Sequence, residues 1–157
     1  MSEKRYPILH IDDDPAITRL VTSLLRKKGL EAEELNDPML ALDVLLKHNY
    51  RVVLLDFDMP GINGMELLTK IKSHDGSVNV IVLTGLISQA TALTAMRRGA
   101  LACLFKPLTD LQPLLDTIQI AFDNTNRWWD TLRRLSDLKR KEQQSVQCEI
   151  ERDIAIV

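Results

Sequence analysis

The sequence lacks the features of a secreted or membrane-embedded protein. Only two cysteines, Cys103 and Cys148, occur among its 157 residues, too few for a disulfide framework or a four-cysteine zinc site. The longest apolar runs, such as residues 52–55, are far shorter than the roughly 20 residues that span a bilayer. The first residues also lack the apolar stretch of a signal peptide. We therefore expect a soluble, cytoplasmic protein with no membrane partner.

An excess of charge of one sign is also absent. The 20 Lys and Arg residues are opposed by 22 Asp and Glu residues, which leaves a net charge of −2. Proteins that coat nucleic acid usually need a strongly basic face, so we expect no direct nucleic-acid partner. The chain has only six Gly and six Pro and is 45% hydrophobic, which excludes a collagen-like or disordered class. Its length allows one globular domain.

Short apolar runs alternate with segments of helical periodicity. The strand-like runs are residues 8–11, 52–55, 80–83 and 101–105, with a weaker edge candidate at 30–35. The amphipathic segments between and after them are residues 15–28, 38–48, 64–73, 88–98 and 110–123. Runs that are apolar on both alternations suit strands buried on both faces of a parallel sheet. Five successive strand–helix units predict an α/β fold with helices on both faces of that sheet.

The chemistry of such a sheet is expected where its strands end, because ligands bind at the carboxyl ends of parallel strands. Polar residues follow four of the predicted strands: Asp12 and Asp13, then Asp56 and Asp58, then Thr84, then Lys106. Two carboxylates about 4 Å apart repel by roughly 4 kcal/mol at an effective dielectric near 20. Three in one pocket therefore call for a cation or for uptake of a proton, and Mg²⁺ prefers such oxygen ligands. One carboxylate can then act as a nucleophile toward phosphorus.

Two nearby polar residues are given structural roles. Asp14 precedes Pro15 at a predicted helix start, which favours an N-capping carboxylate over a metal ligand. His10 interrupts the first apolar run, and we expect a half-buried, hydrogen-bonded histidine there.

Four motifs occur in order at the predicted strand ends: IDDDP at 11–15, LLDFDMPGING at 54–64, VLTG at 82–85 and FKP at 105–107. With these motifs, residues 6–123 resemble the receiver domain of two-component response regulators, of the chemotaxis-regulator type. The resemblance implies a doubly wound, flavodoxin-like sheet of five parallel strands in the order 2-1-3-4-5. It further implies a cis peptide bond between Lys106 and Pro107, which proline makes less costly.

The resemblance also implies a role for each polar residue. Asp56 is expected to accept a phosphoryl group from a histidine kinase or a phosphotransfer protein. Mg²⁺ is expected to be held, directly or through water, by Asp12, Asp13, Asp56 and the backbone carbonyl of Asp58. Thr84 is expected to contact the phosphoryl group and report its presence, and Lys106 to pair with it. Asp58 and Leu86 would border the water that later hydrolyses the acyl phosphate.

The expected function is a signalling switch that acts on a downstream protein target. The chain would not be an enzyme beyond self-catalysed phosphoryl transfer and autodephosphorylation. One departure concerns Cys103, which stands at the switch position where the family commonly has an aromatic residue. Two alternatives are open: a haloacid-dehalogenase-like phosphatase, suggested by Asp56 and Asp58, and an adaptor that works without phosphorylation.

The residues after 123 predict a second part of the chain. The stretch 123–126 is rich in Asp and Asn, and 127–157 has no Gly or Pro, which favours a junction followed by a helix. We therefore expect a receiver domain at 1–123 and a helical extension at 124–157. This extension carries two apolar stripes separated by the polar stretch 139–145. It would either fold back on the receiver or fray, or bind a partner or form a homodimer. It is too short for a winged-helix output domain.

Overall fold

The computed structural model describes residues 4–85 and 88–156, so Leu86 and Val157 lie outside the described residues. Five parallel strands form one sheet in the order β2-β1-β3-β4-β5. The strands are β1 (Ile8–Ile11), β2 (Ala32–Leu35), β3 (Val52–Asp56), β4 (Asn79–Thr84) and β5 (Ala102–Phe105). The predicted α/β fold and strand order are confirmed, and the weakly apolar β2 is an edge strand.

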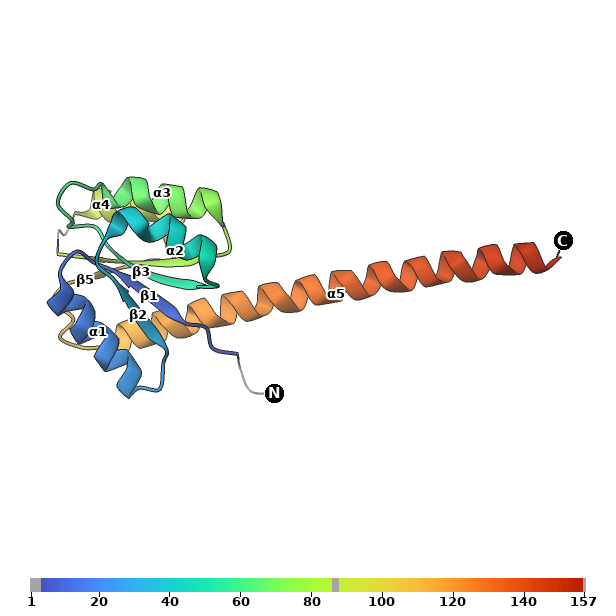
Figure 1. Ribbon diagram of the computed structural model, residues 1–157, viewed down its shortest axis with the longest axis horizontal. Coiled ribbons are helices and arrows are strands. Elements are labelled where there is room, and N and C mark those ends of the chain that lie inside the picture. The colour runs from blue at the N-terminus through green and yellow to red at the C-terminus, as the bar shows by residue number, and fades with distance from the viewer. Residues whose placement is uncertain (1–3, 86–87, 157) are drawn as a thin grey trace. The chain divides into compact units, whose positions relative to one another are not determined.

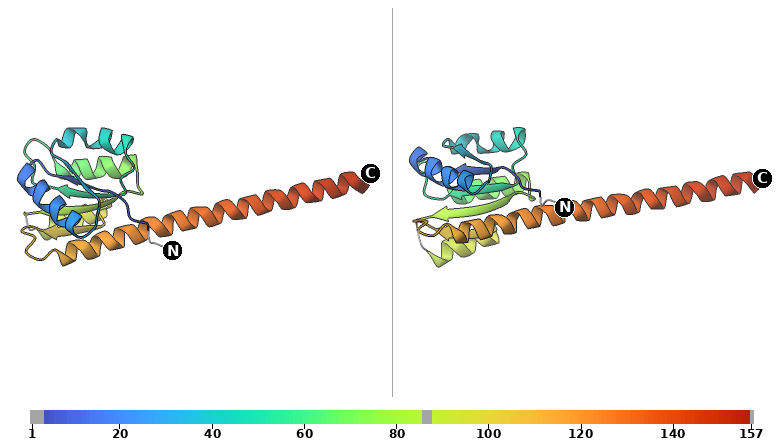
Figure 2. Two further views of the ribbon diagram at one scale, coloured as in Figure 1. Left: turned by 60° about the horizontal axis from the view of Figure 1, so that its bottom comes forward. Right: turned by 90° about the horizontal axis from the view of Figure 1, so that it is seen from below.

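Helices cover both faces of this sheet (Figures 1 and 2). The helical elements are α1 (Pro15–Lys27), the short 3-10 helix η1 (Pro38–Leu40), α2 (Ala41–Lys47), α3 (Gly64–His74), α4 (Gln89–Arg97) and α5 (Gln112–Ile156). Helices α2, α3 and α4 lie on one face, whereas α1 and the first turns of α5 lie on the other. This two-sided cover explains why β1, β3 and most of β4 are fully buried.

The start of α1 fixes the chain beside the predicted site. The Asp14 side chain accepts a hydrogen bond from the Ala16 backbone N–H at 2.9 Å, and Pro15 occupies the first helical turn. The expected N-cap role of Asp14 is thereby confirmed. The cap residue lies two positions after Asp12, so Asp13 alone separates Asp12 from the N-cap of the helix.

His10 differs from its expectation. The residue is fully buried in β1, and neither ring nitrogen has a hydrogen-bond partner in the part of the chain that the structure describes. Burial lowers the pKa of His10 to about 4, so the ring is neutral at pH 7. The expected half-buried, hydrogen-bonded histidine was wrong, because both neighbouring strands and the helices above them cover β1.

The predicted junction at 123–126 is also wrong as a break in secondary structure, because α5 is helical from Gln112 to Ile156. Side-chain hydrogen bonds one turn apart join Gln119 to Asp123 and Arg127 to Asn124. These bonds occupy polar groups that would otherwise compete for the backbone. By internal packing the chain nevertheless divides into two units, Met1–Asp123 and Asn124–Val157. Among the described residues, no helix combines the length and apolar character needed to cross a membrane.

Candidate phosphoacceptor site

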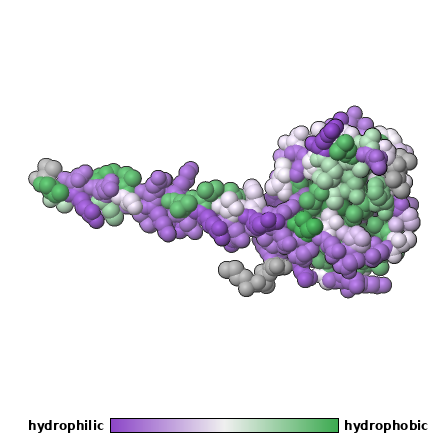
Figure 3. Space-filling view, turned by 180° about the vertical axis from the view of Figure 1, so that it is seen from behind, coloured by the Kyte–Doolittle hydropathy of each residue, from purple (hydrophilic) through white to green (hydrophobic). Residues whose placement is uncertain are grey.

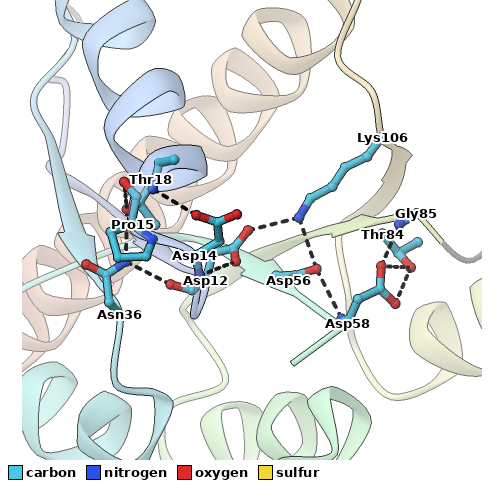
Figure 4. Close-up of polar contacts among 11 residues, drawn as sticks. Asp12, Asp14, Pro15, Thr18, Asn36, Asp56, Asp58, Thr84, Gly85 and Lys106 are labelled. Carbon is cyan, nitrogen blue, oxygen red and sulfur yellow. Dashed lines mark hydrogen bonds and ion pairs between the residues drawn. The ribbon is translucent and has the colours of Figure 1, made fainter. Parts of the chain in front are cut away.

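The predicted site residues come from the carboxyl ends of β1, β3, β4 and β5. Parallel pairing sets Ile11 beside Leu55 and Asp56 beside Leu83, so the residues that follow each strand reach the same edge of the sheet. Figure 4 shows the Lys106 side chain reaching toward Asp12 and Asp56, and the Asp58 side chain turned toward Thr84 and Gly85. The sequence spacing predicts that these residues lie at one edge of the sheet, but only the structure shows which of their side chains are in contact.

A buried ion-pair network joins the first, third and fifth strand ends. The Lys106 ammonium lies 2.9 Å from Asp12 Oδ2 and 3.2 Å from Asp56 Oδ1 (Figure 4). Asp12 is only 1% exposed and Asp56 only 2%, so these charges are largely removed from water. Backbone N–H groups complete the arrangement, because Asp14 donates to Asp12 Oδ1 at 3.0 Å and Asp58 donates to Asp56 Oδ1 at 3.1 Å.

This network shifts the ionisation of its members in different directions. Burial raises the pKa of Asp12, but the Asp14 N–H and the Lys106 ammonium outweigh it and hold that pKa below its ordinary value. Burial raises the pKa of Asp56 above its ordinary value, and the Asp12 charge adds to this, although the Asp58 N–H and Lys106 oppose it. Burial alone would lower the pKa of Lys106, but the two carboxylates raise it. Lys106 is therefore the cation that allows two buried carboxylates to lie side by side.

The same pocket offers a set of oxygen ligands for a divalent ion. Asp12, Asp13 and Asp56 each present a carboxylate oxygen, and these atoms lie within 4.8 Å of one another. Asp13 is exposed, unlike the two buried carboxylates, so the group opens to solvent on one side. Hard oxygen donors that leave room for water suit Mg²⁺. The residues present therefore fit the ion that the sequence predicts.

The position of the Asp58 carboxylate was missed by sequence reasoning. Its Oδ2 accepts a hydrogen bond from the Gly85 backbone N–H at 2.7 Å, and the Thr84 hydroxyl lies 3.4 Å from the same oxygen (Figure 4). The sequence predicts the backbone carbonyl of Asp58 as a metal ligand and places Asp58 beside the hydrolytic water, but it does not predict this contact with Thr84 and Gly85. A signal was available, since an acidic residue two positions after β3 lies opposite the loop that leaves the neighbouring β4.

Two further site features concern β5. Lys106 and Pro107 are joined by a cis peptide bond, as expected. Cys103 is half-buried against the core, and its Sγ lies 3.9 Å from the backbone oxygen of Ala92 in α4. Burial raises the pKa of the Cys103 thiol, which keeps it protonated. The small side chain contacts α4 directly, so no aromatic ring at this position separates β5 from α4.

Comparisons with known proteins agree with this geometry. The family model of the response regulator receiver domain matches residues 8–119. The chain is 34% identical over 125 residues to transcriptional regulatory protein ZraR of Klebsiella oxytoca, covering 80% of this chain and 28% of that protein. It is 30% identical over 119 residues to sporulation initiation phosphotransferase F of Bacillus subtilis, covering 76% of this chain and 93% of that one.

Solved structures give the same result. The beryllofluoride-activated NtrC4 receiver domain dimer superposes with a TM-score of 0.71 and 29% identity, covering 76% of this chain and 98% of that one. The chain thus spans nearly all of the small relatives, but less than half of larger regulators such as ZraR.

Proposed function

Because this chain belongs to the response regulator receiver family, we propose that Asp56 is its phosphoacceptor and that the domain at 1–123 is a phosphorylation-controlled switch. One observation carries this proposal: the Lys106 ammonium lies within 3.2 Å of a carboxylate oxygen of both Asp12 and Asp56 at the carboxyl edge of the sheet. Buried carboxylates in contact with a lysine at the strand ends add nothing to the apolar core. Such a charged group suits a site that binds and releases an anionic group.

In the proposed step, an Asp56 carboxylate oxygen attacks phosphorus and forms a new P–O bond. The P–N bond of the donor, a phosphohistidine of a kinase or phosphotransfer protein, breaks, and its electron pair leaves with the imidazole nitrogen of that histidine. Lys106 would then pair with the added phosphoryl oxygens. Thr84 and Gly85 would donate hydrogen bonds to the same oxygens once they part from Asp58.

Mg²⁺ would be held by Asp12, Asp13, Asp56 and the Asp58 carbonyl, and bound there it neutralises charge on the phosphoryl oxygens. The chain's own residues support this assignment through their chemistry, since all of these donors are oxygen atoms. Asp13 is exposed, unlike Asp12 and Asp56, so it would contribute through water. Return to the unphosphorylated state would follow by hydrolysis of the acyl phosphate within the same pocket.

The proposed partners are a histidine kinase or phosphotransfer protein upstream and a protein target downstream. The extension at 124–157 is proposed to form a homodimer, and the NtrC4 relative is itself described as a receiver domain dimer. The phosphatase and adaptor alternatives are not favoured, because the matched family is a signalling receiver along residues 8–119.

The test is labelling by acetyl phosphate in the presence of Mg²⁺, followed by intact-protein mass spectrometry. The wild type is expected to gain one phosphoryl group per chain. Asp56→Asn is expected to gain none, while Asp43→Asn, a change of the same kind on the exposed surface of α2, keeps wild-type labelling. Undiminished labelling of Asp56→Asn would remove Asp56 from the role. Repeated turnover of a phosphate ester would instead favour the phosphatase.

A further inference from the structure

The helix beyond residue 123 carries an apolar face with no cover among the described residues of its own unit. Its first group is Trp128, Leu132 and Leu135, and its second group is Val146, Ile150 and Ile154. Within each group the spacing is three or four residues, and the groups lie 11 residues apart, close to three turns. The six side chains therefore share one side of the helix. Between 37% and 69% of each is exposed, and Figure 3 shows hydrophobic and hydrophilic patches alternating along the helix.

The charges of this helix divide into two halves of opposite sign. Residues 127–141 contain six basic and two acidic side chains, whereas residues 142–156 contain four acidic and one basic. The net charges are thus +4 and −3. Two such helices side by side in parallel would place like charges together, and in antiparallel orientation they would place each half against its opposite.

From these two patterns we propose that the extension pairs with the extension of a second copy of this chain as an antiparallel helix pair. One register satisfies both patterns. In this register Leu135 lies opposite Val146 of the second copy, and Leu132 and Trp128 lie within one residue of its Ile150 and Ile154. Each contact occurs twice around a two-fold axis, as in an isologous dimer.

The register also accounts for the polar stretch between the two apolar groups. On one side of the two-fold axis, Lys139 of the first copy lies opposite Glu142 of the second. On the other side of the axis, Glu142 of the first copy lies opposite Lys139 of the second. Polar pairs at the centre of an otherwise apolar seam fix orientation and register. A parallel pair would instead set Lys139 against Lys139 and Glu142 against Glu142. Trp128 lies at each end of the apolar seam, and tryptophan is enriched among residues that dominate interface energy.

This inference deepens the proposed self-association and rests on it, but not on phosphoryl transfer. A wild type that pairs but is not labelled by acetyl phosphate would overturn only the phosphoacceptor role. A wild type that is labelled but does not pair would overturn the proposed self-association and this inference with it, and would leave the phosphoacceptor role intact. The two outcomes are therefore measured on the same protein by independent assays.

Disulfide trapping tests the orientation. In the full chain with Cys103→Ser and Cys148→Ser, one protein carries Leu135→Cys and a second carries Val146→Cys. An equal mixture of the two is oxidised, and the crosslinked peptides are identified by mass. The antiparallel register predicts that the 135–146 crosslink dominates, with few 135–135 or 146–146 crosslinks. Predominance of same-position crosslinks would indicate a parallel pair and overturn the proposal.

The oligomeric state provides the second test, by analytical ultracentrifugation of the otherwise unmodified chain. The wild type is expected to reach twice the 17.8 kDa mass of one chain as concentration rises, and Leu135→Glu is expected to remain a monomer. Gln144→Glu, on the opposite side of the helix, adds the same charge and is expected to dimerise like the wild type. A wild type that stays monomeric at all concentrations overturns the proposal, and so does equal dimerisation of Leu135→Glu.

Discussion

The Asp58 carboxylate occupies two hydrogen-bond donors that an incoming phosphoryl group would need. It accepts from the Gly85 N–H and contacts the Thr84 hydroxyl. Gly85 permits this close approach, because a Cβ there would lie only 3.3 Å from Asp58 Oδ2. An anionic side chain thus occupies donors that the proposed phosphoryl group would use, and phosphorylation of Asp56 would have to displace it.

Replacing Asp58 by Ala is therefore expected to speed phosphorylation of Asp56. The change frees both donors and removes one negative charge beside the approaching phosphoryl group. We expect the rate of labelling by acetyl phosphate to rise several-fold, roughly 1 kcal/mol of barrier, as followed by mass spectrometry over time. Asp43→Ala, on the exposed surface of α2, provides the control. A slower rate in Asp58→Ala would show that the carboxylate assists the reaction.

Lys106 contacts the same two carboxylates that are proposed to hold Mg²⁺. Its ammonium lies beside Asp12 and Asp56, so an ion bound there would be repelled by Lys106 in a largely buried site. Lys106→Met is expected to bind Mg²⁺ more tightly by roughly tenfold, about 1.4 kcal/mol, in isothermal titration calorimetry. Lys70→Met, on the exposed surface of α3, should keep wild-type affinity. Weaker binding in the Lys106 variant would mean that the lysine helps to hold the carboxylates in place for the ion.

At the scale of elements, the turn between α3 and β4 is held by a charged cluster at the opposite edge of the sheet. Arg51 Nη1 lies 2.9 Å from Asp75 Oδ2, and the Ser77 N–H and hydroxyl donate to Asp75 Oδ1. Burial raises the pKa of Asp75, but the hydrogen bonds from Ser77 and the charge of Arg51 outweigh it and lower that pKa. The carboxylate form is thus favoured by folding.

The pH dependence of stability follows from this shift. A depressed pKa in the folded state contributes stability above the unfolded-state pKa near 3.8, and that contribution is lost as the pH falls through the folded-state value. The free energy of unfolding is therefore expected to fall more steeply between about pH 5 and about pH 3 in the wild type than in Asp75→Asn. Urea unfolding at several pH values measures this difference, with Asp43→Asn as the control. Parallel curves for wild type and Asp75→Asn would contradict the assignment.

The elements themselves were largely predictable, and the exceptions have local causes. The buried strands are short runs that are mostly apolar on both faces, although β1 contains His10 and β3 and β4 end in Asp56 and Thr84. The Asp14-Pro15 pair carries its own helix-start signal. The continuity of α5 through Asn124 was not predictable from single-residue preferences, because side-chain bonds one turn away offset them. The orientation of Asp58 also depended on a contact between two loops that follow different strands. Contacts of this kind are set by the register of β3 and β4, which apolar runs do not specify.

On the scale of the whole molecule, the two units divide the proposed tasks. The pocket lies within residues 12–106, and the α5 residues that cover the sheet, such as Leu114, Ile118 and Phe122, belong to the first unit. The proposed pairing face begins at Trp128 and belongs to the second. The fold thus keeps the reacting groups and the pairing groups on separate parts of the chain.

A chain ending at Asn126 tests this division. It retains every strand, the complete pocket and the core-facing turns of α5, so we expect it to fold and to accept a phosphoryl group from acetyl phosphate at the wild-type rate. It lacks all six apolar residues of the pairing face, and we expect it to sediment as a monomer at concentrations where the full chain is a dimer. If the shortened chain folds, as judged by its circular dichroism, but is labelled slowly, pairing or the extension itself contributes to the phosphoacceptor site. If it folds and still dimerises, the receiver unit carries a self-association surface of its own.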